Sequence, residues 1–91
     1  MLTNTDIAER SPNKVAAEMG EETVILDIES GYYFQLNKVG ARIWALMEAP
    51  IAVGDLCTRL EAAFDVDSAT CRAEVGEFLT LMRAKGLATI G

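Results

Sequence analysis

Apolar and polar residues alternate along the first part of the chain and then change to a longer period. Alternation with a period of two covers residues 14–19, 22–29 and 32–36, and it places successive side chains on opposite faces of a strand. Short turn signals separate these runs, so we predict a three-stranded antiparallel meander. In this prediction Val15, Ala17 and Met19 share one face of the first strand; in the second, Val24, Leu26 and Ile28 point inward and Thr23, Asp27 and Glu29 outward.

The third strand and the residue after it carry the clearest local signal. Ser30-Gly31 favours a turn before the strand, and Asn37 after it can cap a helix with its side-chain oxygen. Because only helices are expected to follow, this strand could remain at the edge of the sheet, where an extended peptide can add a further strand. The alternation places Tyr32, Phe34 and Leu36 on one face, and Tyr33 and Gln35 on the other.

Beyond residue 37 the apolar residues recur at helical spacing. We predict a first helix that ends before Pro50, a second over residues 53–64, and a third that begins at Asp67 or Ser68 and ends near Gly86. Residues 87–90 form a short apolar tail that could pack on the core.

The apolar surface of the third helix is wider than a single core contact needs. At about 100° per residue, Leu81 lies on one flank near Glu74 and Lys85, whereas Arg72 and Arg83 lie on the other. The width is compatible with packing by both the sheet and the other helices, or with a groove along one flank. The core stripe consists of Cys71, Val75, Phe78, Leu79 and Met82.

Length and composition indicate one small domain. The chain has 91 residues, of which 51% are hydrophobic, enough for a modest core. We expect residues 1–12 to form a flexible tail and residues 13–91 to form the domain. No apolar run approaches the ~20 residues that span a bilayer, and the N-terminus lacks a secretory pattern. We therefore expect a cytoplasmic protein that does not contact membranes.

The side chains do not offer the usual constellations of an enzyme. Histidine is absent, which removes the commonest general base and a common zinc ligand. Cys57 and Cys71 lie on apolar helix stripes, as buried small hydrophobes do. The carboxylates are spread as on a solvated surface, and no phosphate-binding glycine motif is present. We predict a non-catalytic protein without catalytic residues, metal or cofactor.

The charge disfavours nucleic acid as a partner. A net charge of −6 opposes the phosphate contacts that supply most of the affinity for nucleic acids. A DNA-binding winged helix stays open as an alternative, although neither the second nor the third helix is basic.

At this point particular residues resemble a known family, the PqqD-like proteins, also called RiPP recognition elements. The resemblance covers residues 13–90. The second helix departs from it, because family members often begin that helix with Ser or Thr and this chain has Val53-Gly54. The motifs that carry the resemblance are Leu26-Asp27, the run from Ser30 to Asn37, Gly40, Ile43-Trp44, Phe78-Leu79 and Gly86-Leu87.

The resemblance implies an α+β fold, with a three-stranded antiparallel meander followed by three helices, similar to a winged helix-turn-helix. It also implies a peptide chaperone that holds the leader of a ribosomally made precursor peptide in a cleft between the third strand and the third helix. The residues expected to line this cleft are Tyr32, Tyr33, Phe34, Gln35, Arg72, Val75, Leu79 and Arg83.

Two pathways fit this expectation. One is maturation of a lasso peptide or a similar product, with a leader peptidase and a cyclase as partners. The other is pyrroloquinoline quinone biosynthesis, with a radical-SAM enzyme as partner. Free strand edges would also permit a homodimer.

Overall fold

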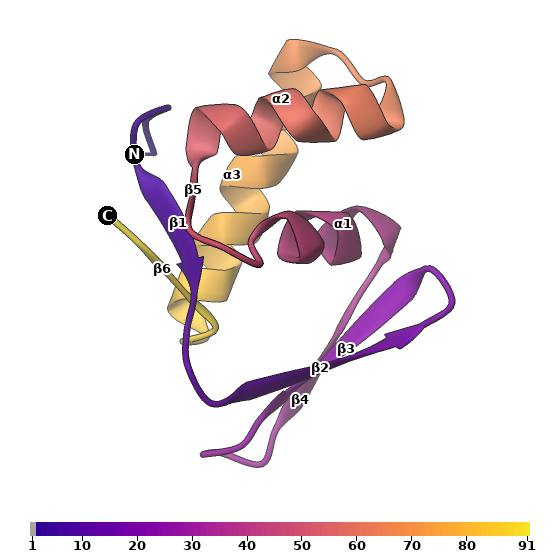
Figure 1. The fold of residues 1–91 in the computed structure, drawn as a ribbon, viewed down its shortest axis with the longest axis vertical. Coiled ribbons are helices and arrows are strands. Elements are labelled where there is room, and N and C mark those ends of the chain that lie inside the picture. Colours follow the sequence, from indigo (N-terminus) through magenta and orange to yellow (C-terminus); the bar gives the residue numbers. More distant parts are fainter. Residues whose placement is uncertain (1) are drawn as a thin grey trace.

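The computed structural model describes residues 2–91 and contains the expected antiparallel meander. Its strands are β2 (Lys14–Met19), β3 (Glu22–Asp27) and β4 (Tyr33–Leu36), in the order β2-β3-β4. This sheet forms the lower part of the molecule in Figure 1, and the helices lie above it. The fold is α+β, as the sequence predicted.

Three helices lie on the inner side of the sheet: α1 (Lys38–Leu46), α2 (Val53–Phe64) and α3 (Ser68–Ala84). Helix α1 packs directly on β3 and β4, and α2 packs on α1 and α3. Asn37 caps α1 by accepting a hydrogen bond from the Gly40 N–H at 2.9 Å. Asp67 caps α3 through the N–H of Thr70 at 2.8 Å. Both caps satisfy backbone donors that a helix start leaves free. Within the described chain, no helix has the length and apolarity needed to cross a membrane.

The segment expected to be a loose tail instead contains a paired strand. β1 (Ile7–Arg10) lies between β5 (Ile51–Ala52) and β6 (Ala88–Ile90) in a second small antiparallel sheet. These strands, and with them the two chain ends, lie together at the left of Figure 1. The prediction missed β1 because its partners lie far along the chain.

The same N-terminal segment also completes the start of α2. The residue before α2 is Ala52, which has no capping side chain. The carbonyls of Asp6 and Asn4 accept the N–H groups of Val53 and Gly54 at 2.9 and 3.0 Å. Backbone from the N-terminus thus replaces the Ser or Thr cap that this helix lacks.

The expected orientation of β3 is wrong. Ile25 is fully buried and Thr23 is 6% exposed, whereas Leu26 and Ile28 are 40% and 57% exposed. The cause is the pairing with β4, where Ile25 lies opposite Phe34. Residues directly opposite each other share a face of the sheet, so the inward position of Phe34 carries Ile25 inward as well.

The core joins the inner face of the sheet to all three helices and to the small sheet. Ile25 of β3 and Leu87, just before β6, are both fully buried in this core. The helical positions follow the predicted stripes closely. The fully buried large side chains are Ile25, Ile43, Met47, Leu56, Leu60, Leu79, Met82, Leu87, Val75 and Cys71.

Two alanine substitutions distinguish the observed face of β3 from the expected one. Ile25→Ala should reduce the free energy of unfolding by about 2–5 kcal/mol, because it empties part of a closed core. Leu26→Ala should cost about 1 kcal/mol or less, because that side chain faces solvent. Urea unfolding measures both values. A larger loss for Leu26→Ala than for Ile25→Ala would contradict the observed orientation.

Candidate functional site

The outer edge of β4 is unpaired within residues 2–91, because β3 is its only partner in the sheet. Tyr33 on this strand is 73% exposed, and Tyr32 just before it is 71% exposed. Free backbone N–H and C=O groups along such an edge can pair with another extended chain. β4 therefore provides the edge strand that the sequence suggested.

The hydrogen-bond pattern shows which groups of β4 are free. The N–H of Asp27 donates to the carbonyl of Tyr32 at 2.8 Å, so this pair belongs to the hydrogen-bonded class of an antiparallel ladder. The classes alternate residue by residue. With the observed register, Phe34 and Leu36 direct their backbone groups toward β3, and Tyr33 and Gln35 direct theirs outward.

A turn built around Asp27 holds the start of β4. The Ser30 hydroxyl donates to Asp27 Oδ2 at 2.9 Å, and Lys14 Nζ lies 3.3 Å from Oδ1. The hydrogen bond from Ser30 is the largest cause that holds the pKa of Asp27 below its usual value; desolvation opposes it, and smaller contributions from Lys14 and the Glu29 N–H add to the lowering. Gly31 supplies the positive φ of 78° that this turn requires.

A cavity of about 780 Å³ lies between α1 and α3, beyond the end of β4. Val39 of α1 and Phe78 and Leu81 of α3 contribute apolar walls. The two helices approach closely here: a Cβ on Gly40 would come within 3.0 Å of Phe78 Cε1. Gly40 thus allows the two helices to approach closely, and Leu81, which is 50% exposed, offers apolar surface to a ligand.

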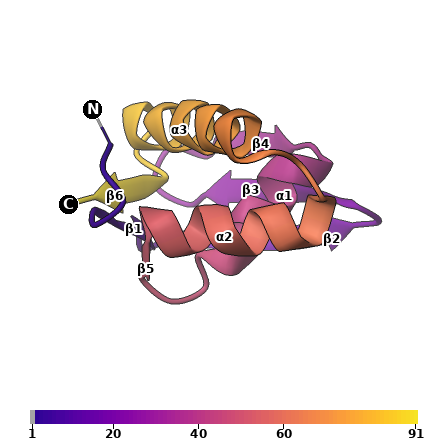
Figure 2. The same ribbon diagram turned by 90° about the horizontal axis from the view of Figure 1, so that it is seen from above.

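Lys85 joins this side of α3 to β4. Its Nζ lies 5.6 Å from the centre of the Phe34 ring, within the range of a cation–π contact. Figure 2 shows α3 above the side of the sheet that β4 forms. The flank of α3 that carries Leu81 and Lys85 is therefore the one beside the free edge.

The opposite flank of α3 faces the N-terminal segment. Arg72 donates a hydrogen bond to the side chain of Asn4 and, with Leu2 and Val53, lines a separate cavity of about 590 Å³. Arg83 is exposed and lies about 20° from Arg72 around the helix. The structure thus does not bring the two arginines together with β4.

The remaining expected residues divide between surface and core. Tyr33, Phe34 and Gln35 lie on β4, with Tyr32 before it. Val75 and Leu79 are fully buried and support the site from beneath.

The sequence placed Lys85, Leu81 and Glu74 together on one helix flank but did not assign them to the site, and it did not single out Glu77. Helical periodicity showed the two flanks, but it does not report which one meets the sheet.

The two cysteines are buried and poorly ionised. Cys71 Sγ–H donates to the carbonyl of Cys57 at 3.4 Å. Burial raises the pKa of the Cys71 thiol to about 11, and burial also raises that of Cys57. Among residues 2–91, no three His, Cys, Asp or Glu side chains gather where a metal ion could bind.

Sequence comparison assigns the family. Residues 22–88 match the model of coenzyme PQQ synthesis protein D, PqqD. The chain belongs to the PqqD family. Domains of this family that act as RiPP recognition elements are non-catalytic peptide-binding domains, as the sequence analysis predicted. Among curated protein sequences, none matches this chain significantly.

Two solved structures share the fold of this PqqD-family chain. The first is TbiB1 in complex with the TbiA(beta) leader peptide, with a TM-score of 0.80 and 30% identity over 88% of this chain and 93% of TbiB1. The second is lasso peptide synthetase B1 complexed with the leader peptide, with a TM-score of 0.76 and 24% identity over 90% and 96% of the two chains. Both are similar along nearly their whole length.

The thiols should react only when this PqqD-family domain unfolds. The thiolate is the reactive form, and burial disfavours it at both cysteines. At pH 8 we expect DTNB to label the native protein at least about a hundredfold more slowly than the urea-unfolded protein. Absorbance at 412 nm follows the reaction. Equal rates in the two states would show that the thiols are accessible and ionised in the folded domain.

Proposed function

We propose that this PqqD-family chain binds the leader of a ribosomally made precursor peptide as an added strand on β4. The observation that carries the proposal is the free β4 edge beside the cavity between α1 and α3. The likeness to TbiB1, whose structure contains a leader peptide, supports the same ligand class. The domain would present the leader to an enzyme that modifies the rest of the precursor.

The backbone of β4 supplies the affinity in this proposal. Tyr33 and Gln35 each direct one N–H and one C=O toward the free edge, and each backbone hydrogen bond contributes about 0.5–1.5 kcal/mol. An added strand turns its side chains alternately to the two faces of the sheet. One set would therefore meet Phe34, Leu81 and Lys85 on the helical side, and the other would lie beside Tyr33 on the open face. The contacts of the ligand side chains with these residues would supply specificity.

For the pathway we propose maturation of a lasso peptide or a similar product, with a leader peptidase and a cyclase as partners. The leader peptide in the structure of the 30% identical TbiB1 supports a precursor-binding role. The name of the matching family model favours a second candidate, pyrroloquinoline quinone biosynthesis with a radical-SAM partner. Titration against the precursor encoded beside each type of enzyme distinguishes the two pathways.

Proline substitutions along β4 should separate binding from folding. Gln35→Pro removes an outward N–H and should weaken leader binding about two- to tenfold, while the fold survives because edge positions tolerate proline. Phe34→Pro removes an N–H that faces β3 and should unfold the sheet. Isothermal titration with the leader measures affinity, and circular dichroism reports folding.

The matched control lies on the other free edge of the same sheet. Ile28 N–H donates to the Asn13 carbonyl, so by the same alternation the N–H of Ala16 points away from β3. Ala16→Pro should leave both the fold and leader affinity unchanged. If Ala16→Pro weakens binding as much as Gln35→Pro does, the leader does not pair with β4.

Substitutions on α3 should show which flank the leader follows. Leu81→Asp places a charge on the apolar wall beside β4 and should reduce leader affinity at least about tenfold, since burying an unpaired charge is costly. Arg72→Glu should change affinity less than about twofold, because Arg72 contacts Asn4 on the opposite flank. Leu81 and Arg72 are both exposed positions on α3. If Arg72→Glu weakens leader binding more than Leu81→Asp does in the same titration, the leader binds along the arginine flank.

A further inference from the structure

The cavity between α1 and α3 continues toward β4 at the contact of Lys85 with Phe34, and we call this surface the groove. The groove carries opposite charges at its two ends. Lys85 lies at one end, over the ring of Phe34. Glu74 and Glu77 line the cavity at the other end, where α1 begins. Leu81 and Phe78 lie between them and provide apolar wall. A strand that follows this groove therefore meets positive charge, then apolar surface, then negative charge.

These three charges remain available to a ligand. Among the described residues, the ion pairs join Lys14 to Asp27 and Lys38 to Glu21, and none involves Lys85, Glu74 or Glu77. All three side chains are exposed. Their exposure limits the strength of any single contact but leaves each free to select the charge of an approaching residue.

We propose that the groove selects peptides with an acidic and a basic side chain four residues apart, with apolar side chains between them. The acidic side chain would lie at Lys85, and the basic one at Glu74 and Glu77. This inference rests on the proposed function, because it assumes that the peptide pairs with β4. It specifies the class of leader that this particular chain accepts.

The spacing follows from helix and strand geometry. Glu77 and Glu74 lie eight and eleven residues before Lys85 on the helix, or ~12 and ~16 Å at 1.5 Å per residue. An extended strand covers the same length in about four to five residues at ~3.3 Å each. Both charged side chains must point to the helical face, and side chains on one face recur every second residue. Four residues is the even spacing that fits.

Selection from a random dodecapeptide library displayed on phage tests this inference without a known leader. Peptides enriched on the native protein should carry an acidic and a basic residue four positions apart. Selection on Lys85→Glu should replace the acidic residue of that pair by a basic one. Synthetic peptides with the selected acidic residue reversed should bind the native protein about two- to fivefold more weakly, as expected for one exposed ion pair.

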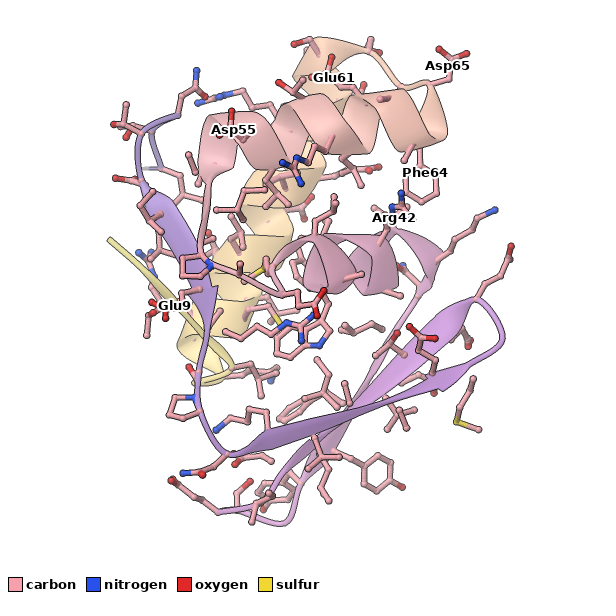
Figure 3. The ribbon with its side chains drawn as sticks, viewed as in Figure 1. Glu9, Arg42, Asp55, Glu61, Phe64 and Asp65 are labelled. Carbon is pink, nitrogen blue, oxygen red and sulfur yellow. The ribbon has the colours of Figure 1, made fainter. Side chains whose placement is uncertain are left out.

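Arg42→Glu provides the matched control for net charge. Arg42 lies on α1 near Phe64 at the end of α2, as Figure 3 shows, and it lines a different cavity. Its reversal changes the net charge of the protein as much as Lys85→Glu does. Selection on Arg42→Glu should return the same peptides as selection on the native protein. If both variants change the selected charges alike, the effect comes from net charge and the inference is wrong.

Amide shifts distinguish failure of this inference from failure of the proposed function. Enriched peptides that shift the amides of Tyr33 and Gln35 but lack the charge pair would overturn the inference and leave strand addition intact. Enriched peptides that leave those two amides unchanged would overturn both. An absence of any enriched peptide would count against both as well.

Discussion

The pairing of β3 with β4 is the constraint on which the rest of the domain depends. Placing Ile25 opposite Phe34 turns both side chains toward the helices and leaves Tyr33 and Gln35 facing outward. A shift of this register by one residue would place Ile25 opposite Tyr33 or Gln35 instead of Phe34, and residues directly opposite each other share a face of the sheet. Either the fully buried Ile25 would then turn outward, or Phe34 would turn outward in place of Tyr33 and Gln35. The same register decides which N–H and C=O groups reach the free edge, so core packing and the capacity to bind a strand share one cause.

The position of α3 is the second constraint, and the core sets it. Cys71, Val75, Leu79 and Met82 are buried along one stripe of the helix, and this stripe fixes the rotation of α3 above the sheet. Leu81 and Lys85 then lie beside β4, and Arg72 beside the N-terminal segment. The N-terminal segment in turn completes α2 through the carbonyls of Asp6 and Asn4. The small sheet thus stabilises the helical layer from the side away from the free edge.

Much of this architecture could be predicted from the sequence because its signals are local. The Asn37 cap depends on residues three apart, and the observed bounds of α2 and β2 match the predicted ranges 53–64 and 14–19. β1 could not be predicted, because its stability comes from partners at residues 51–52 and 88–90. The facing of β3 could not be predicted either: residues 24–26 are Val-Ile-Leu, which suit either face, and only the partner strand decides.

In the candidate site, too, some features follow from local sequence and others only from contacts between distant residues. The strand half depends on the alternation of Phe34 and Tyr33, which sequence reports directly. The helix half depends on the absolute rotation of α3, and periodicity reports only relative angles. The structure supplies the missing angle through the contact of Lys85 with Phe34.

Both ends of β4 are held before any peptide arrives. The Asp27 turn fixes its start, and the capped first turn of α1 follows its last residue. An edge held in this way is already in the conformation that pairing requires, so little further ordering of the protein opposes binding. The entropy cost of strand addition then falls mainly on the incoming peptide. Four strand residues can accordingly serve as a binding surface.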